Sequence, residues 1–249
     1  MKLYWAPRTR SLRGLWILEE AGRPYEKELI DIRSGKQSTP EYHRINPMEK
    51  VPALSDGEAM VAESAALCAY VAERVPEAGL APPVGDPLRG RYLQWLFFAA
   101  NIEAAFTQKF AKLEIPSGQA GWGDFDRVFN VIDEAVTKGP WILGDRFSAA
   151  DVMIGGDLFF GSTLLKIVQP KPASAAYIAR CIERPAFKRA QALNEAGAEE
   201  APAHLAGGWL PQMTESTHSL ILFFGMAPMR LAATWPPLNT ISAGIERTL

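Results

Sequence analysis

The spacing of apolar residues divides the chain into an alternating first part and a helical second part. Within residues 1–80, short apolar runs typical of strands alternate with stripes of helical spacing. Asp56-Gly57, a strong hairpin signal, joins two of these runs. The pattern predicts strands at Leu3–Trp5, Tyr25–Ile32, Ala53-Leu54 and Met60-Val61, and helices starting near Leu12 and running from Ala65 to Val75.

The order of strand, helix, strand, hairpin and helix predicts a thioredoxin-like α/β domain over residues 1–80. A linker rich in proline and glycine follows at residues 81–87. Over residues 88–206 every apolar stretch has helical spacing, which predicts an all-α helical bundle domain. Residues 207–249 differ in character and are predicted to be an atypical tail, whose proline, serine and threonine content favours poor order.

A capping box stands within the helical part, at Ser148 to Asp151. A serine followed three residues later by an acid satisfies two amides at the start of a helix. Apolar residues at helical spacing follow it. We therefore predict a structural role for Asp151, and no catalytic one.

Composition and charge restrict the class of protein. The chain has 249 residues, of which 48% are hydrophobic and 22% charged, as is ordinary for a soluble globular protein. The net charge of −2, without a long run of one sign, argues against a nucleic-acid groove and against an electrostatic membrane patch. Arg8, Arg10 and Arg13 interrupt any apolar signal region, which predicts a cytoplasmic, reducing setting. Cys68 and Cys181 are predicted to be small buried residues.

Several kinds of site are absent from the sequence pattern. The three histidines are scattered and form no metal-ligand spacing, and no phosphate-loop or dinucleotide fingerprint occurs. We therefore predict no metal. The apolar run Leu220–Phe224 falls far short of the ~20 residues that span a bilayer.

Two motifs near the hairpin point to a binding site for a small acidic peptide. Pro52 opens a strand, and a cis Val51-Pro52 bond would turn the backbone groups of Val51 into a groove. Glu63-Ser64 leads into a helix, where Ser64 is predicted to be the N-cap. A strand edge pairs with a peptide backbone, and a helix start holds a carboxylate.

Three blocks of sequence resemble the cytosolic glutathione S-transferase family, and most closely its bacterial and fungal branch. The blocks are Leu3 to Gly22, Asn46 to Leu67 with both motifs above, and Leu143 to Asp151 with the capping box. They stand in the family's order, and the resemblance covers roughly residues 1–205.

The resemblance implies a cytoplasmic, homodimeric glutathione transferase that serves detoxification. It would use glutathione as co-substrate and activate the glutathione thiolate for attack on a small electrophilic substrate. In such a protein Val51 would pair its backbone with the cysteinyl part of glutathione. Glu63 and Ser64 would hold the γ-glutamyl end. Lys50 would face the glycine carboxylate through a charge-assisted contact, although a solvated surface lysine is the open alternative.

A transferase of this kind stabilises a thiolate, usually with a hydroxyl donor and a helix N-terminus. Thr9 takes the functional position of the bacterial and fungal branch, and Tyr4 that of tyrosine-type members. Some serine-type members have their hydroxyl where this chain has Arg8, which speaks against a serine-type mechanism. Thr9 is preferred, Ser11 comes second and Tyr4 third, because Ser11 also fits an N-cap and Tyr4 a core aromatic. Arg8 and Arg10 are guanidinium donors that could stabilise a thiolate electrostatically, and Arg10 is predicted to bind glutathione.

The acceptor site is predicted to lie between the two domains. Phe106, Phe110 and Trp122 are its predicted apolar wall, with core positions as the alternative. Two other functions fit the same motifs. One is a non-catalytic glutathione-binding or regulatory protein on the same fold, and the other is a glutathione-dependent peroxidase or dehalogenase.

Overall fold

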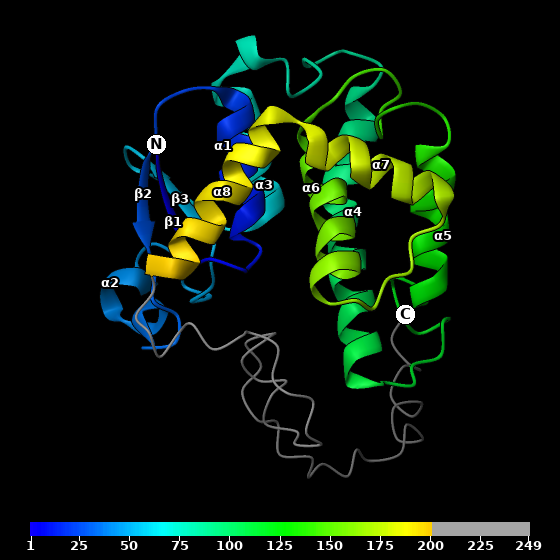
Figure 1. Cartoon of the computed structure of the whole chain (residues 1–249), viewed down its shortest axis with the longest axis horizontal. Coiled ribbons are helices and arrows are strands. Elements are labelled where there is room, and N and C mark those ends of the chain that lie inside the picture. The colour runs from blue at the N-terminus through cyan, green and yellow to red at the C-terminus, as the bar shows by residue number, and fades with distance from the viewer. Residues whose placement is uncertain (201–249) are drawn as a thin grey trace, which may run out of the picture. The chain divides into compact units, whose positions relative to one another are not determined.

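The computed structural model describes residues 1–200, with Glu199 and Glu200 described in their backbone alone. The predicted end of the helical domain at residue 206 and the predicted tail at 207–249 lie outside the described residues. The described part has the predicted order, a small α/β sheet layer followed by helices (Figure 1).

Four short strands form one mixed sheet in the order β2-β1-β3-β4. β1 runs parallel to β2 and antiparallel to β3, and β3 pairs antiparallel with β4. Gly57, with φ of +62°, allows the tight turn between β3 and β4, as the hairpin signal predicts. The strands are β1 (Lys2–Trp5), β2 (Glu26–Leu29), β3 (Ala53–Asp56) and β4 (Ala59–Val61).

The second strand is shorter than the predicted Tyr25–Ile32, because β2 ends at Leu29. The Asp31 carboxylate accepts hydrogen bonds from the amides of Arg33 and Ser34, at 3.1 and 3.2 Å. A side chain that satisfies nearby amides in this way turns the backbone out of the sheet.

Helices lie on both faces of the sheet. Successive strand residues point to opposite faces. Leu3 faces Gly14 of α1, and Tyr4 packs edge-on against Tyr42 of α2, with ring centroids 6.1 Å apart. The helical elements of this part are α1 (Ser11–Ala21), η1 (Lys36–Ser38), α2 (Pro40–His43), α3 (Ser64–Arg74) and η2 (Pro76–Ala78).

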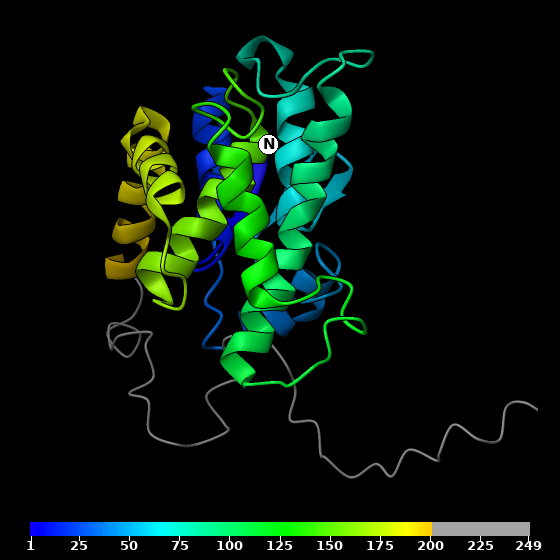
Figure 2. The ribbon, with the colours of Figure 1, turned by 90° about the vertical axis from the view of Figure 1, so that its right-hand side faces the viewer.

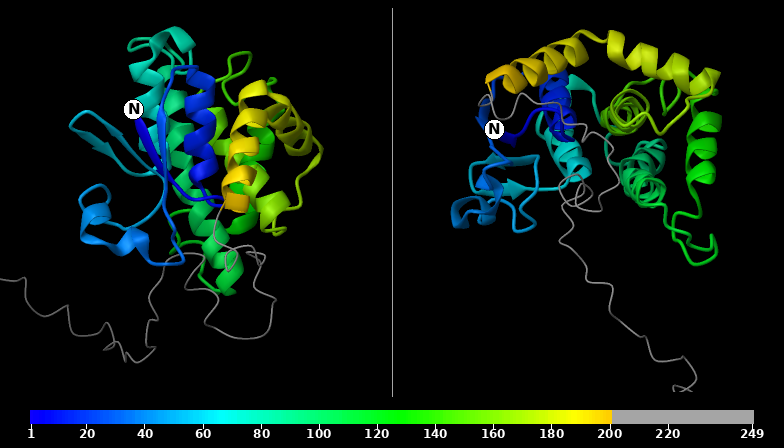
Figure 3. Two further views of the ribbon diagram at one scale, coloured as in Figure 1. Left: turned by 60° about the vertical axis from the view of Figure 1, so that its left-hand side comes forward. Right: turned by 60° about the horizontal axis from the view of Figure 1, so that its bottom comes forward.

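The second part is helical throughout, as predicted, with α6 at its centre. Ten of the eleven residues of α6 are buried. In the right-hand view of Figure 3, α4 and α6 are seen nearly end-on, and the yellow helices α7 and α8 run along one side of them. The elements are α4 (Arg89–Ala111), α5 (Phe125–Val136), α6 (Ala149–Phe159), the π-helical turn η3 (Phe160–Leu164), α7 (Pro172–Glu183) and α8 (Pro185–Glu200).

Close helix contacts join the sheet part to the helical part. α8 packs along α1 (Figure 1), and α3 lies beside α4 (Figure 2). Gly197 of α8 touches the indole of Trp5 so closely that a Cβ there would overlap the ring. Gly156 of α6 likewise leaves room for Arg13 of α1. These small residues let α1 lie between the sheet and the helices.

The predicted capping box is confirmed at the start of α6. The Ser148 amide donates to Asp151 at 2.8 Å, and the Ala150 amide donates to the Ser148 hydroxyl at 3.3 Å. The Ile142 amide and the Tyr177 hydroxyl also donate to Asp151, each at 2.8 Å. Burial raises the pKa of Asp151 to about 6 although these bonds favour the carboxylate. Asp151 therefore joins the start of α6 to Ile142 and Tyr177 inside the core of the helical part.

Both cysteines are buried and free, as predicted. Burial raises the pKa of the Cys68 thiol to about 12 and raises that of Cys181 as well, so neither side chain is a reactive thiolate. Within residues 1–200, no helix is both long and apolar enough to cross a membrane. The same residues contain no group of His, Cys, Asp and Glu side chains arranged to hold a metal ion.

Candidate active site

The loop from β1 to α1 brings two of the predicted hydroxyl residues into one hydrogen-bonded group. Thr9 Oγ1 lies 2.7 Å from the carbonyl oxygen of Ala6 and 2.9 Å from Ser11 Oγ, and it accepts from the Ser11 amide at 3.1 Å. Ser11 Oγ accepts from the Ala6 amide at 3.2 Å. Because Thr9 has one hydroxyl proton, it donates to one acceptor at a time. The side chains of the loop thus hold its backbone in one conformation.

The two hydroxyls differ in their access to a ligand. Ser11 is fully buried, whereas Thr9 is half-buried. The alternative in which Ser11 is the N-cap of α1 is wrong, because Arg10 holds that position and Ser11 is the first helical residue. The Ser11 hydroxyl bonds back to Ala6 and so fixes the loop. Thr9 is therefore the more accessible hydroxyl of the pair.

Tyr4, the third predicted hydroxyl residue, belongs to the core. It is 8% exposed and packs with Ile30, Tyr42 and Ala53 on the α2 face of the sheet. This is the alternative that its place on a strand also predicted. The structure gives Tyr4 a packing role and leaves Thr9 and Ser11 in the loop.

The backbone of this loop is also held by α8. The Arg8 amide donates to the buried Asn194 side chain at 2.9 Å, and Arg8 has a φ of +56°. A non-glycine residue with positive φ is kept there by its surroundings. Sequence reasoning missed Asn194, because its partner lies 186 positions away along the chain.

The Val51-Pro52 peptide bond is cis. The segment before it is held by two side chains, because the Tyr42 hydroxyl and the Asn46 amide group both donate to the Lys50 carbonyl, at 2.6 and 2.8 Å. The Lys50 side chain is exposed and Val51 is half-buried. The segment thus forms a fixed backbone edge directly before the start of β3.

The start of α3 lacks a capping side chain. The prediction that Ser64 is the N-cap is wrong by one residue, because Glu63 holds that position and makes no side-chain cap bond. Glu63 has a φ of +67°, a backbone conformation that few non-glycine residues adopt. Ser64 is therefore the first helical residue. The amides of the first turn keep the positive end of the helix dipole without a capping oxygen.

Helix α1 connects these pieces. It begins at Ser11, it packs beside α3, and its Gly14 lies against Pro52, where a Cβ would come within 3.4 Å of the proline Cβ. The Thr9 loop, the cis-proline edge and the start of α3 are thereby joined through one helix. The arrangement provides a backbone edge for a peptide, a positive helix end for a carboxylate and a hydroxyl for a third group.

A cluster of charges that sequence reasoning missed lies beside the loop. Glu103 of α4 accepts from Arg10 Nε and Nη2, at 2.9 and 2.5 Å, and from Arg13 Nη2 at 3.0 Å. Arg13 also pairs with the buried Asp157 of α6. The Arg10 guanidinium lies 4.5 Å from the ring centroid of Phe160. One available signal was that Glu103 is the single acid of the long helix α4.

The pKa values of this cluster follow from burial and pairing. Burial lowers the pKa of Arg13 to about 10, in opposition to the Glu103 carboxylate, which raises it. Burial raises the pKa of Glu103, but Arg10 and Arg13 outweigh it and hold the value below its ordinary range. At neutral pH Arg13 is therefore a cation and Glu103 is a carboxylate.

The three aromatic residues predicted to form the wall of the acceptor site differ in burial. Phe106 is fully buried and stacks on Phe129, with centroids 5.8 Å apart, so it is a core residue. Phe110 is partly exposed. Trp122 is partly exposed as well, and its indole nitrogen donates to Gln108 at 2.8 Å. Only the latter two remain available as wall residues.

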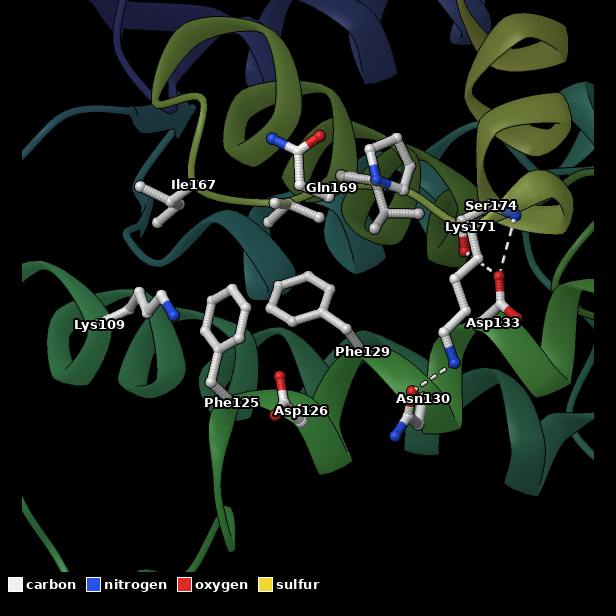
Figure 4. Close-up of a pocket in the computed structure, with 13 residues that line it drawn as sticks. Lys109, Phe125, Asp126, Phe129, Asn130, Asp133, Ile167, Gln169, Lys171 and Ser174 are labelled. Carbon is white, nitrogen blue, oxygen red and sulfur yellow. Dashed lines mark hydrogen bonds between the residues drawn. The ribbon is translucent and has the colours of Figure 1, made fainter.

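A cavity of about 430 Å³ lies elsewhere, within the helical part (Figure 4). Phe125 and Phe129 point into it from α5, opposite Ile167, and Lys171 bonds to Asn130 at its rim. None of the predicted site residues lines this cavity. It is therefore separate from the Thr9 loop.

Two family models match the chain. The model described as the N-terminal domain of glutathione S-transferase matches residues 1–73, and that of the C-terminal domain matches residues 99–160. The glutathione S-transferase hmp2 of Hypomyces subiculosus is 32% identical over 166 residues, which are 61% of this chain and 78% of that protein. The chain belongs to the glutathione S-transferase family.

Other relatives agree with this family and show its range. The glutathione S-transferase GstA of Escherichia coli O157:H7 is 27% identical over 190 residues, covering 74% of this chain and 94% of GstA. A protein of Escherichia coli K12 named disulfide-bond oxidoreductase YfcG is 30% identical over 164 residues, covering 60% of this chain and 75% of YfcG.

Solved structures of glutathione S-transferases share the fold. The bacterial enzyme BphK, in a ternary complex, matches with a TM-score of 0.67 at 29% identity, over 78% of this chain and all of BphK. A sphingomonad glutathione S-transferase complexed with glutathione matches with a TM-score of 0.66 at 27% identity, over 78% of this chain and 99% of that one. The chain thus has the thioredoxin-like and helical domains of a glutathione transferase.

Proposed function

We propose that this glutathione transferase binds glutathione along the Val51-Pro52 edge and activates its thiol at the Thr9 loop for attack on an electrophilic substrate. The observation that carries the proposal is the joining of that edge, the uncapped start of α3 and the Thr9 hydroxyl through one helix, α1. The sphingomonad relative whose structure contains glutathione supports the same ligand.

Four residues receive binding roles in this proposal. The backbone of Val51 pairs with the cysteinyl part of glutathione, as a strand edge pairs with a peptide. The γ-glutamyl carboxylate meets Ser64 and the first amides of α3, and the exposed Glu63 takes the γ-glutamyl ammonium. Lys50, which is exposed, faces the glycine carboxylate.

Thr9 is the proposed donor to the thiolate. Its oxygen accepts from the Ser11 amide, and a hydroxyl that accepts a hydrogen bond is a stronger donor. When glutathione binds, its thiol releases its proton to solvent, and the Thr9 hydroxyl proton turns from the Ala6 carbonyl to the sulfur. This hydrogen bond stabilises the thiolate without a covalent intermediate. Ser11 supports the loop from its buried position. The enzyme then supplies proximity between the thiolate and the electrophile.

The electrophile is a small molecule that meets the thiolate beside Phe110 and Trp122, and its conjugation serves detoxification. The chain acts as a homodimer. Its exposed apolar side chains support such an interface, with Phe97 on α4 71% exposed and Met60 on β4 49% exposed. The two buried free cysteines agree with a reducing, cytoplasmic setting.

Calorimetry with two peptides, followed by a conjugation assay with an aryl halide, tests the proposal. Glutathione is expected to bind at least roughly tenfold more tightly than cysteinylglycine, because the dipeptide lacks the γ-glutamyl group that the α3 start would hold. Equal affinity for both peptides would contradict the placement of the site. Tight glutathione binding without conjugation would favour the non-catalytic alternative.

A further inference from the structure

Arg10 and Glu103 form a two-point ion pair between the active-site loop and the helical part. Both oxygens of Glu103 are used, one by Arg10 Nε at 2.9 Å and the other by Arg10 Nη2 at 2.5 Å. A planar guanidinium bound at two points to a carboxylate has a fixed orientation as well as a fixed position. The Arg10 and Glu103 side chains are 18% and 32% exposed, so the pair is partly shielded from solvent.

A second arginine, Arg13, also holds Glu103 in place. Arg13 binds the same carboxylate at 3.0 Å and also pairs with Asp157, which is fully buried in α6. The carboxylate is therefore fixed between two arginines of α1 and its preceding loop. The Glu103 carboxylate therefore fixes the position of the loop relative to α4 and α6.

Arg10 stands between Thr9 and Ser11 in the sequence. Any rotation of the Arg10 backbone moves the Thr9 hydroxyl and the Ser11 amide that bonds to it. A displacement of about 1 Å in a reacting geometry lowers a rate on the order of a hundredfold. The ion pair is thus placed to control the one hydroxyl on which thiol activation depends.

We propose that Glu103 is a positioning residue of the transferase reaction, which holds Arg10 so that the Thr9 hydroxyl stays aimed at the thiol of bound glutathione. This role rests on the proposed function. Glu103 touches neither the thiol nor the electrophile in this account, and it acts through Arg10.

The charges around the loop allow positioning to be separated from a purely electrostatic effect. The ion pairs at the loop and at the start of α1 are Arg8 with Glu195, and Arg10 and Arg13 with Glu103 and Asp157. Lys50 and Glu63 are the exposed charged residues of the proposed glutathione edge. Removing the Glu103 carboxylate leaves the region more positive. Electrostatics alone would then favour the thiolate and lower the pKa of the bound thiol. Loss of the Thr9 donor would raise that pKa.

The experiment compares Glu103→Gln with the matched control Glu20→Gln. Glu20 also binds an arginine at two points, Arg184 Nε at 2.6 Å and Nη2 at 2.7 Å, but at the other end of α1. Its side chain is 7% exposed, so the control variant disturbs stability at least as much as the test variant. Both are assayed for kcat, KM for glutathione and the pH dependence of kcat/KM with an aryl halide.

Glu103→Gln is expected to lower kcat at least about tenfold with little change in KM for glutathione, and to raise the apparent pKa of the bound thiol. Glu20→Gln is expected to keep the wild-type values of all three. A lowered thiol pKa in Glu103→Gln would overturn the positioning role in favour of simple electrostatics. Equal behaviour of the two variants would also overturn it, because the pair would then be merely structural.

Arg10→Lys provides a second, milder variant in case Glu103→Gln does not fold. It keeps the positive charge and loses the two-point geometry. Arg10→Lys is expected to show the same fall in kcat and the same rise in thiol pKa, whereas an unchanged pH profile would contradict the positioning role. Wild-type conjugation is measured first. A wild-type chain that neither binds glutathione nor conjugates overturns the proposed function itself, and this role with it.

Discussion

At the scale of single residues, the Thr9 hydroxyl has a dual bonding role. It closes the loop through Ala6 and Ser11, and it is the half-buried member of that group. A hydroxyl that is already oriented by an amide loses little freedom when it turns to a ligand. The sulfur would therefore meet a donor whose oxygen is fixed and whose proton alone has to move.

Replacing Thr9 tests this role. Thr9→Ala is expected to lower kcat on the order of 10²-fold, since loss of one donor to a developing anion costs about that much. Thr9→Ser keeps the hydroxyl and is expected to retain most of the activity. The measurement is steady-state conjugation of an aryl halide. If Thr9→Ala remains close to the wild-type rate, another group activates the thiol, and the assignment fails.

The sequence predicts those residues of the candidate site that belong to local motifs. Thr9, Pro52 and Glu63 stand at a turn, a strand start and a helix start, where a short pattern is informative. Glu103 and Asn194 were missed. Each meets the loop through a contact that spans 90 or more positions of the chain, and no local pattern encodes such a contact.

At the scale of elements, the start of α6 depends on a carboxylate at the centre of the helical part. Asp151 accepts from two amides and from the Tyr177 hydroxyl, each at 2.8 Å. The local motif predicted the bond to Ser148. The bonds to Ile142 and Tyr177 come from tertiary packing, and they make the capping box a junction of three segments.

Asp151→Asn is expected to destabilise the protein by about 3 kcal/mol, because an amide NH2 would face donors inside the core. The pH dependence has a defined sign. The pKa is raised from 3.8 to about 6 in the folded state, so the folded chain binds more proton than the unfolded chain between these values. The contribution of Asp151 to stability therefore decreases as pH rises from about 4 to 6 and is constant above that.

Urea unfolding of the wild type and of Asp151→Asn at a series of pH values measures this contribution. The effects of the other titrating groups cancel in the difference between the two free energies of unfolding. The difference in unfolding free energy is expected to shrink as pH rises through about 6. A difference that grows over the same range would mean that the hydrogen bonds outweigh burial and hold the pKa below 3.8.

The element boundaries show where pattern reasoning loses accuracy. The start of α3 was predicted one residue late as a cap on Ser64, because serine is a common N-cap. The helix starts at Ser64 instead, because Glu63 before it has a positive φ that is not helical. The prediction for the second strand runs past its end at Leu29. The Asp31 side chain binds a nearby backbone amide and so ends the strand, and the spacing of apolar residues carries no sign of this hydrogen bond.

At the scale of the whole molecule, the proposed homodimer depends on apolar side chains that the described chain leaves exposed. Phe97 on α4 is the clearest, at 71% exposure. Phe97→Glu is expected to convert the dimer to a monomer, because a buried unpaired carboxylate opposes association. Light scattering coupled to size-exclusion chromatography measures the mass.

Val84→Glu is the control for that substitution. Val84 is 92% exposed and lies in the predicted linker, away from any helix or strand. It is expected to leave the dimer intact. A wild-type chain that is monomeric at micromolar concentration, or a Phe97→Glu variant that remains dimeric, would contradict the proposed interface.

The pKa of the thiol of bound glutathione tests the central claim most directly. It is measured by titrating the ultraviolet absorbance of the thiolate against pH in the purified wild-type protein with saturating glutathione. We predict a pKa clearly below that of the free peptide, because the Thr9 hydroxyl and the positive surroundings of the loop favour the thiolate. An unshifted pKa in a protein that does bind glutathione would contradict thiol activation and leave a binding protein on a transferase fold.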